Sequence, residues 1–166
     1  DNGTTKLDMA ASSVGGDLTL TSGHADGIVD SGTVTVTGNL TLENDVSGGN
    51  ITMGTLAVDG WIAITTSGSS SAVTVANDVG LILATSNMGG TFSGEADSGD
   101  ITQVDDTSLT IGAASTFIIA TGSNIALDKS GNTFSAGVTM KVGDGTSGSF
   151  GNITFEEGAA VKLDSN

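Results

Sequence analysis

The sequence predicts an all-β protein, folded as a parallel β-helix (β-solenoid) of roughly triangular cross-section with about 7 coils of ~22 residues. Three observations support this prediction: short alternating strand patterns, one five-residue phrase that recurs along the chain, and a composition rich in small residues. No stretch shows the apolar spacing of an amphipathic helix, so no helix is expected.

Short apolar–small–apolar triplets run through the whole chain, and Gly, Asn, Asp or Ser bounds each of them. Examples are Leu18-Thr19-Leu20, Val34-Thr35-Val36 and Val138-Thr139-Met140. This period of two is typical of short β-strands with one buried face. Thr most often takes the outward position, which suits its β-branched side chain.

The recurring phrase is G-N-L-T-L at 38–42. It returns as G-D-L-T-L at 16–20, G-N-I-T-M at 49–53, G-D-I-T-Q at 99–103, S-N-I-A-L at 123–127 and G-N-I-T-F at 151–155. Gly followed by Asn or Asp favours a tight corner, because these residues tolerate left-handed backbone and bond to nearby main chain. We therefore interpret the phrase as a corner plus a strand, and we expect corners such as Asn39 to stack as side-chain ladders.

The spacing of the triplets predicts three columns of stacked inward residues. The first column is Leu18, Leu40, Ile62, Leu81, Ile101, Ile125 and Ile153, in steps of 22, 22, 19, 20, 24 and 28. The second is Ile28, Ile51, Val73, Phe92, Leu109, Phe134 and Val161, and the third is Val34, Leu56, Phe117 and Val138. The period loosens between 81 and 110. Residues 1–166 are expected to form one solenoid domain, either one subunit or a segment of a longer filament.

Small residues dominate the composition: 26 Gly, 24 Thr and 20 Ser make up 70 of the 166 residues, against one Trp and five Phe. A repeated thin core can be built from such a list. The competing architecture is an antiparallel β-sandwich, which usually needs more large aromatics for a core ~10 Å thick. Sequence signals for the hairpins of such a sandwich are rare in this chain, since Asn2-Gly3 is the only Asn-Gly pair.

The formal net charge of −15 argues against nucleic acids and anionic membranes as partners, because the four Lys form no cluster and there is no Arg. No apolar run approaches the ~18 residues of a membrane helix, so no membrane insertion is expected. Asp1 opens a polar stretch without a signal-peptide pattern, as expected of a mature N-terminus or of an excerpt.

The corner phrases, together with T-V-T-V-T-G at 33–38 and S-G-N-T-F-S-A-G-V-T at 130–139, resemble repeats of filamentous-haemagglutinin-type and autotransporter-passenger proteins. The resemblance is one of repeat style and covers most of the chain. It implies a right-handed parallel β-helix, export to the bacterial cell surface, and adhesive or structural work. It assigns a role to no individual residue.

Enzyme activity is not expected, and neither catalytic residues nor cofactors are predicted. β-Helix lyases typically gather Asp, Lys and Arg in a groove, whereas this chain has no Arg and one His, His24. The carboxylate pairs Asp105-Asp106 and Glu156-Glu157 are adjacent in sequence, so on a strand their side chains face opposite sides. Neither pair is therefore preset for glycoside hydrolysis.

Two acidic stretches are weak candidates for Ca²⁺ sites. Glu95, Asp97 and Asp100 bring three carboxylates within six residues around a Gly, and Asp26 and Asp30 form the second group. Ca²⁺ requires six to eight oxygen ligands in a flexible loop. Neither stretch has the EF-hand spacing, so a solvated acidic loop is the simpler expectation.

Three outward features are candidate contact surfaces. Trp61 and Ile82 lie in variants of the corner phrase where the outward side turns apolar, and they are weak candidates for a subunit interface. Outward Thr19, Thr41, Thr102 and Thr154 fall in one column, as in ice-binding solenoids, but Ala63, Ile82 and Ala126 interrupt that column.

We therefore predict an extracellular structural protein, a β-solenoid subunit of a self-assembling surface filament, sheath or adhesin stalk. Its expected partner is itself, through head-to-tail contacts that form an open polymer. The alternative is a ligand-binding solenoid, either a glycan-binding adhesin or an ice-binding protein. A polysaccharide-degrading enzyme is the least favoured reading.

Overall fold

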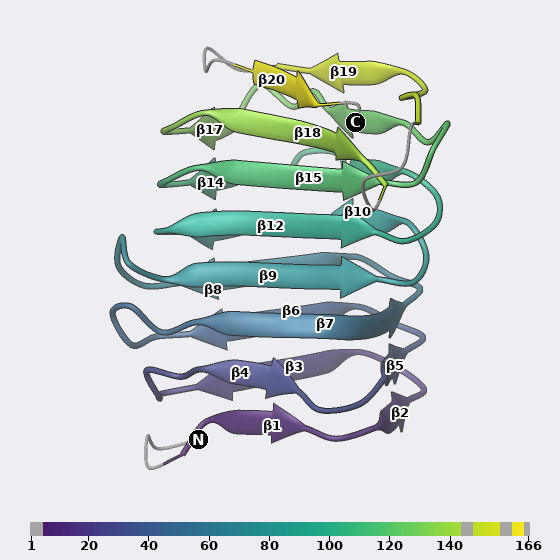
Figure 1. Ribbon diagram of the computed structural model, residues 1–166. Coiled ribbons are helices and arrows are strands. Elements are labelled where there is room, and N and C mark those ends of the chain that lie inside the picture. Colours follow the sequence, from purple (N-terminus) through teal and green to yellow (C-terminus); the bar gives the residue numbers. More distant parts are fainter. Residues whose placement is uncertain (1–4, 144–147, 157–160, 165–166) are drawn as a thin grey trace.

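The computed structural model describes residues 5–143, 148–156 and 161–164, the last four by their backbone alone. It confirms the predicted fold class: every regular element among these residues is a β-strand, and parallel strands stack into a β-solenoid (Figure 1). The near strands in Figure 1 run from left to right while the chain climbs, so the solenoid is right-handed. None of the described residues belongs to a helix that could span a membrane.

Two parallel sheets of ten strands each form the walls of the solenoid. The front sheet of Figure 1 contains β1 (Leu7–Met9), β4 (Ile28–Asp30), β7 (Ile51–Val58), β9 (Ala72–Asn77), β12 (Thr91–Ala96), β15 (Ser115–Ile119), β18 (Val138–Val142) and β20 (Val161–Asp164), with β2 (Ser12–Val14) and β5 (Val34–Val36) as a side branch. The back sheet contains β3 (Leu18–Ser22), β6 (Leu40–Asn44), β8 (Ile62–Thr66), β10 (Leu81–Leu83), β13 (Ile101–Gln103), β16 (Ile125–Leu127) and β19 (Ile153–Phe155), with β11 (Ser86–Met88), β14 (Leu109–Ile111) and β17 (Thr133–Phe134) as a second branch.

The first predicted column is confirmed except at one step. Leu18 pairs with Leu40, which pairs with Ile62. The column resumes from Leu81 through Ile101 and Ile125 to Ile153. Ile62 itself pairs with Leu83 rather than Leu81. The predicted step of 19 was therefore wrong, and the true step of 21 stays close to the period of the other coils.

The second and third predicted columns are wrong in their later parts. Phe92 pairs with Ser115 in the front sheet, whereas Leu109 lies in the back sheet. Leu56 pairs with Asn77, and Phe117 pairs with Gly94. The cause is a shift in the position of the bend. In the early coils the chain bends within the front sheet and forms two strands there, such as β4 and β5. In the later coils it bends within the back sheet and forms two strands there, such as β13 and β14.

The recurring phrase does form corners, and the Asn and Asp side chains of these corners bridge successive coils. The Asn39 amide donates to Asp17 Oδ1 over 2.8 Å, and the Trp61 amide donates to Asn39 Oδ1 over 3.2 Å. At Asp100 and Asn124 the pattern repeats, because the Asn124 amide donates to Asp100 Oδ1 over 2.7 Å. The predicted ladder therefore exists, but its rungs are mainly side chain to backbone. They satisfy corner amides that no strand partner reaches.

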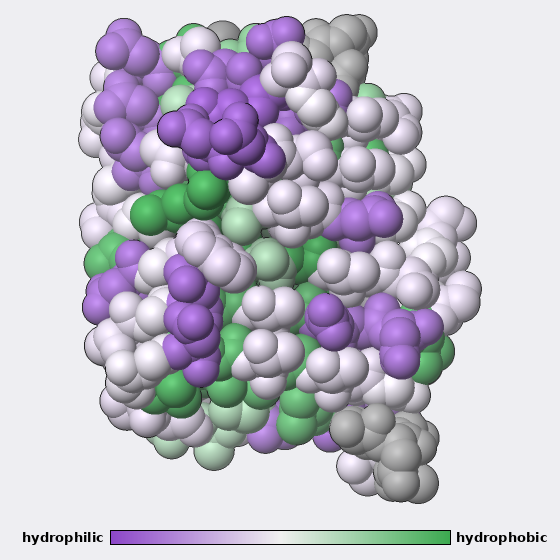
Figure 2. Space-filling model, turned by 180° about the vertical axis from the view of Figure 1, so that it is seen from behind, coloured by the Kyte–Doolittle hydropathy of each residue, from purple (hydrophilic) through white to green (hydrophobic). Residues whose placement is uncertain are grey.

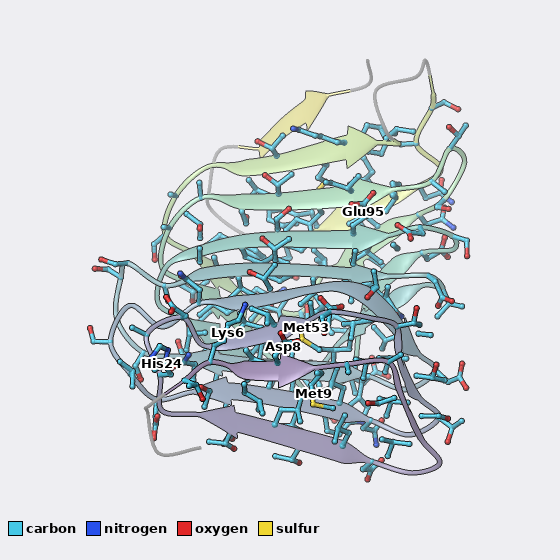
Figure 3. All side chains as sticks on the ribbon, turned by 60° about the horizontal axis from the view of Figure 1, so that its bottom comes forward. Lys6, Asp8, Met9, His24, Met53 and Glu95 are labelled. Atoms are coloured by element: carbon cyan, nitrogen blue, oxygen red, sulfur yellow. The ribbon has the colours of Figure 1, made fainter. Side chains whose placement is uncertain are left out.

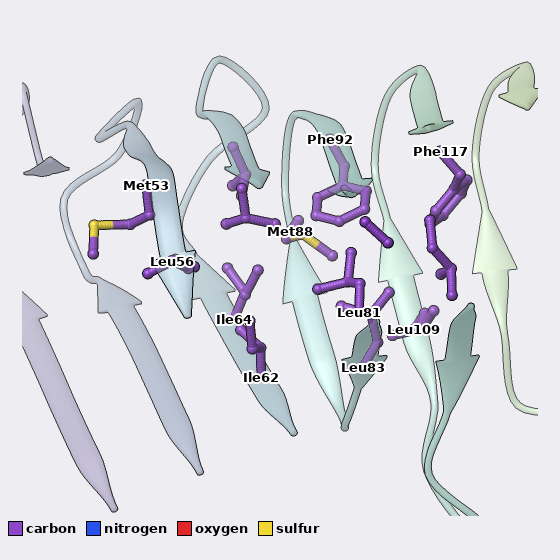
Figure 4. Packing of buried hydrophobic residues seen from close by; sticks show 14 of the residues in the cluster. Met53, Leu56, Ile62, Ile64, Leu81, Leu83, Met88, Phe92, Leu109 and Phe117 are labelled. Atoms are coloured by element: carbon purple, nitrogen blue, oxygen red, sulfur yellow. The ribbon is translucent and has the colours of Figure 1, made fainter. Parts of the chain in front are cut away.

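The core is a thin apolar column between the two sheets (Figure 4). In its C-terminal half, Phe92, Phe117, Phe134 and Phe155 form a stack with ring centroids 5.4, 6.2 and 5.1 Å apart. Gly94 makes room for this stack, since a Cβ there would lie 2.7 Å from the Phe92 ring. Four of the five Phe therefore stack in the C-terminal half of an otherwise aliphatic core.

Buried polar side chains occur where a strand loses its backbone partner. Asn77, which is 1% exposed, bonds to the amide and carbonyl of Val58 and to the carbonyl of Gly80. Ser86 accepts from the Ile64 amide over 3.0 Å and donates to the Ala84 carbonyl. These side chains replace missing ladder bonds at the coils where the bend changes sheet.

Candidate functional site

The main concave site lies on the back sheet between the loops of successive coils. The loop after β13 and the loop after β16 stack on each other, and Glu156 follows β19 at the same corner. Together they form a cleft of about 520 Å³ that is lined by Asp106, Thr107, Ser108, Asp128, Lys129, Ser130, Gly131 and Glu156. Figure 2, which views the back face, shows hydrophilic side chains gathered toward the C-terminal end of the molecule.

A charged network joins the two loops beside this cleft. Lys129 Nζ lies 2.9 Å from Asp105 Oδ1 and 3.4 Å from Asp128 Oδ1. The hydrogen bond from Lys129 and its positive charge lower the pKa of Asp105, and the bonds to both carboxylates raise the pKa of Lys129. Because the Asp105 side chain is 91% exposed, water and salt screen this interaction, and it orients the loops more than it stabilises the fold.

Next to the two loops, a buried pair of amide side chains, Gln103 and Asn132, joins the two coils. Gln103 and Asn132 exchange two hydrogen bonds of 2.8 Å, and the Leu109 amide also donates to Asn132 Oδ1 over 2.9 Å. Gln103 also donates to the Thr107 carbonyl. In the loop above, Asp106 has a φ of 58°, a left-handed conformation that Asp tolerates better than most residues. These hydrogen bonds tie the ends of the loop 104–108 to the coil above it.

Among the described residues, no group of three or more His, Cys, Asp or Glu side chains is placed to hold a metal ion. The lining offers hydroxyl, carboxylate and ammonium groups. Such groups suit a polar, polyhydroxylated ligand. Sequence reasoning considered the Asp105-Asp106 pair only for catalysis and missed the cleft. The sequence signal for the cleft is the step of 24 residues from Ile101 to Ile125, which contains the loop 104–108, whereas the preceding coil has only residues 84–85 between β10 and β11.

In the first group of calcium candidates, Asp100 bonds to a neighbouring coil, whereas Glu95 and Asp97 line one depression. The Asp100 carboxylate accepts from the backbone and side chain of Asn124 at one corner. Glu95 lies on the outer side of β12, and Asp97 follows at the end of this strand, where it helps to line a second depression of about 330 Å³ together with Glu95. Asp97 also borders a third depression, of about 220 Å³, beside Asp78.

The second group of candidates lies several coils away, as the separation of His24 and Glu95 in Figure 3 shows. The Asp30 carboxylate accepts three hydrogen bonds of 2.7–2.9 Å, from the Gly54 amide and from the amide and hydroxyl of Thr55. It fills the irregular part of β7 and has a clear structural role. Asp26 is exposed, and its Oδ2 lies 3.8 Å from His24 Nδ1.

Both interface candidates face outward, and both are half-buried rather than fully exposed. Trp61 sits at the corner before β8, and Ile82 is the outward residue of β10, beside Thr102. The most exposed large apolar side chain of the described residues is Val79, at 39%, which sequence reasoning did not single out. The predicted Thr column is wrong at one step. Thr19, Thr41 and Ala63 form one column, and Ile82, Thr102, Ala126 and Thr154 form another. Because Ile62 pairs with Leu83, the two columns are two residues out of line with each other.

A longer hydroxyl column lies on the front sheet and was missed. Thr52 pairs with Thr74, and the column continues through Ser93 and Thr116 to Thr139 without interruption. A search for a fixed period does not find this column, because its residues are 22, 19, 23 and 23 positions apart along the chain. The pairing registers, rather than a fixed period, reveal this column.

Comparison with protein families gives one match. A family model described as repeats of unknown function (DUF5649) matches residues 1–59 and 70–141, well over half of the chain. The chain belongs to the DUF5649 repeat family. The interval between the two DUF5649 matches contains Trp61 and β8, the coil at which the bend moves from the front to the back sheet. A search of curated proteins and a search of solved structures each found no significant match.

Proposed function

We propose that this DUF5649 repeat protein is an extracellular structural protein, a β-solenoid subunit of a self-assembling surface filament, sheath or adhesin stalk. The role is mechanical rather than catalytic. Export to the cell surface is part of the proposal, and it is supported by the resemblance of the corner phrases to secreted passenger repeats. The supporting structural observation is that each coil depends on neighbours above and below for the burial of its core.

The burial of equivalent residues shows this dependence. Leu7 and Leu18, in the first described coil, are only half-buried, whereas their counterparts one coil later, Ile28 and Leu40, are 0% exposed. At the other end Ile153 is half-buried, and its pairing partner Ile125 is 0% exposed. Stacking a further coil of the same design on either side would bury these side chains.

The pairing registers define how a second copy would stack. Asp8 and Lys162 occupy the same register position of the front sheet, so β20 beside β1 of the next copy would bring these two residues of opposite charge to paired positions on neighbouring strands. In the same register, Val161 would pair with Leu7. A cross-strand charge pair contributes roughly 0.2–1 kcal/mol, and the apolar neighbours add to it. The stacked contact is head to tail and therefore open-ended.

Negative-stain electron microscopy across a range of concentrations tests this proposal. We expect fibres whose length grows with protein concentration. Lys162→Glu should shorten them, because two acidic residues would then adjoin at the junction, and the Asp8→Lys/Lys162→Glu swap should restore them. Lys129→Glu, which changes the net charge equally but lies in the cleft, is the matched control.

Discrete, monodisperse rods at every concentration would contradict the filament proposal. If such rods bound carbohydrates on a glycan array through the cleft around Asp106 and Lys129, the alternative of a ligand-binding solenoid would replace it.

A further inference from the structure

The outer face of the front sheet differs in charge from the rest of the molecule. The chain carries 19 acidic residues and a formal net charge of −15. The five strands β7, β9, β12, β15 and β18 nevertheless contain one acidic and one basic residue, Glu95 and Lys141. Depletion of charge distinguishes the centre of a protein–protein interface from ordinary surface.

Short side chains, mostly Thr, Ser and Ala, make this face flat. The uninterrupted column from Thr52 to Thr139 runs along its middle. Ala72 and Thr91 lie in the column on one side, and Ala76 lies in the column on the other. A surface of short side chains allows the close approach of a second flat sheet at ~10 Å, as in face-to-face sheet packing.

The two charged residues of the face, Glu95 and Lys141, lie at equal distances on either side of Ile118. Glu95 pairs with Ile118, and Ile118 pairs with Lys141, so the three side chains follow one another in a single outward column. Ile118 is half-buried and is the one large apolar residue of that column between the two charges. Glu95 and Lys141 are thus one coil below and one coil above Ile118, ~4.8 Å away on each side.

A two-fold axis along β15 converts this arrangement into a self-complementary surface. Rotation about that axis exchanges the coil above for the coil below. Glu95 then faces the partner's Lys141, Lys141 faces the partner's Glu95, and Ile118 meets the partner's Ile118. We propose that the outer face of the front sheet binds a second copy of the chain, with the two rods antiparallel and the front sheets face to face. Such a contact is isologous, because both subunits use the same patch.

The size of the patch sets the strength of the contact. The overlap centred on β15 covers β12, β15 and β18, about 14 Å along the solenoid axis at ~4.8 Å per strand and about 20 Å along the strands. The resulting area of roughly 300 Å² per partner is smaller than the ~800 Å² of a standard stable interface. We therefore expect a weak, reversible dimer. This lateral contact is independent of head-to-tail stacking, since it uses a different surface.

Analytical ultracentrifugation of the full chain, up to about 1 mM protein and at about 0.15 M salt to screen the net repulsion, tests the proposal. The wild type should show a monomer–dimer equilibrium. Glu95→Lys or Lys141→Glu alone should weaken the dimer by about tenfold or more, because like charges then face each other. The combined Glu95→Lys/Lys141→Glu swap should restore the wild-type constant. If the wild type forms fibres, the measurements use the Lys162→Glu background, which separates the two assemblies.

The controls match each charge change at a site off the face. Glu43→Lys, at an exposed position of β6 in the back sheet, matches Glu95→Lys, and Lys129→Glu, in the cleft, matches Lys141→Glu. Far-ultraviolet circular dichroism verifies that every variant is folded. A wild type that stays monomeric over the whole range, a swap that fails to restore association, or controls that act as strongly as the face variants would overturn the lateral dimer. Fibre formation would be unaffected by that failure.

Discussion

Replacing Asn77 with leucine should lower the free energy of unfolding by about 3 kcal/mol. The side chain is 1% exposed and holds three backbone groups that no strand reaches: the Val58 amide, the Val58 carbonyl and the Gly80 carbonyl, at 2.8, 3.0 and 2.9 Å. Leucine has a similar volume but leaves all three groups buried without partners, at a cost of ~1–3 kcal/mol each before the surroundings relax.

The measurement combines urea unfolding with amide hydrogen exchange at Val58. The exchange measurement is needed because repeat arrays can lose cooperativity, and a single global transition then hides a local loss. Asn87→Leu is the matched control, because Asn87 is exposed on β11. Equal stability of the two variants, with unchanged protection of the Val58 amide, would show that Asn77 does not replace ladder bonds.

Phe117→Ala should have the largest effect of any single core truncation, a loss of about 4 kcal/mol. Phe117 is fully buried, and its ring centroid lies 5.4 Å from that of Phe92 and 6.2 Å from that of Phe134. Truncation removes the middle of the stack and opens a cavity that two sheets of hydrogen-bonded strands cannot close. Ring contacts of this kind contribute beyond the area they bury.

Phe155→Ala provides the comparison. Phe155 stands at the end of the same stack and is half-buried, with one ring neighbour at 5.1 Å. Its truncation should cost less than half as much, since solvent already reaches the site. If thermal unfolding shows equal losses for the two variants, the stack is not the continuous core element described above.

Much of the fold could be predicted from the sequence, because the corner phrase couples two local signals. Gly and Asn or Asp mark the turn, and the alternating apolar residues that follow mark the buried face. The column through Leu40 and Ile62 follows directly from that coupling. The prediction failed beyond Phe92, because the bend moves between sheets, and no local residue pattern records on which sheet a coil bends.

The sites were harder to predict than the fold. The charge column of Glu95, Ile118 and Lys141 depends on steps of 23 and 23, and it becomes visible only when the strands are in register. The cleft arises because the loops 104–108 and 128–132 of two successive coils stack, which brings Asp106 and Lys129 into one lining. The acidic residues noted as calcium candidates include Asp30 and Asp100, whose carboxylates bond to neighbouring coils. Composition alone cannot separate such structural carboxylates from ligands.

The central claim is that coils stack in parallel and in register, and a disulfide between neighbouring coils tests it most directly. The chain contains no cysteine, so a Thr74→Cys/Ser93→Cys variant reports on one pair of stacked outward residues. Adjacent strands place their Cα atoms ~4.8 Å apart, within the range that a disulfide spans. Mild oxidation should therefore form an intramolecular disulfide, detected as a mass loss of about 2 Da, while Thr74→Cys/Asn87→Cys, on opposite sheets, should remain reduced. Free thiols in the first variant, or equal oxidation of both, would contradict the in-register solenoid.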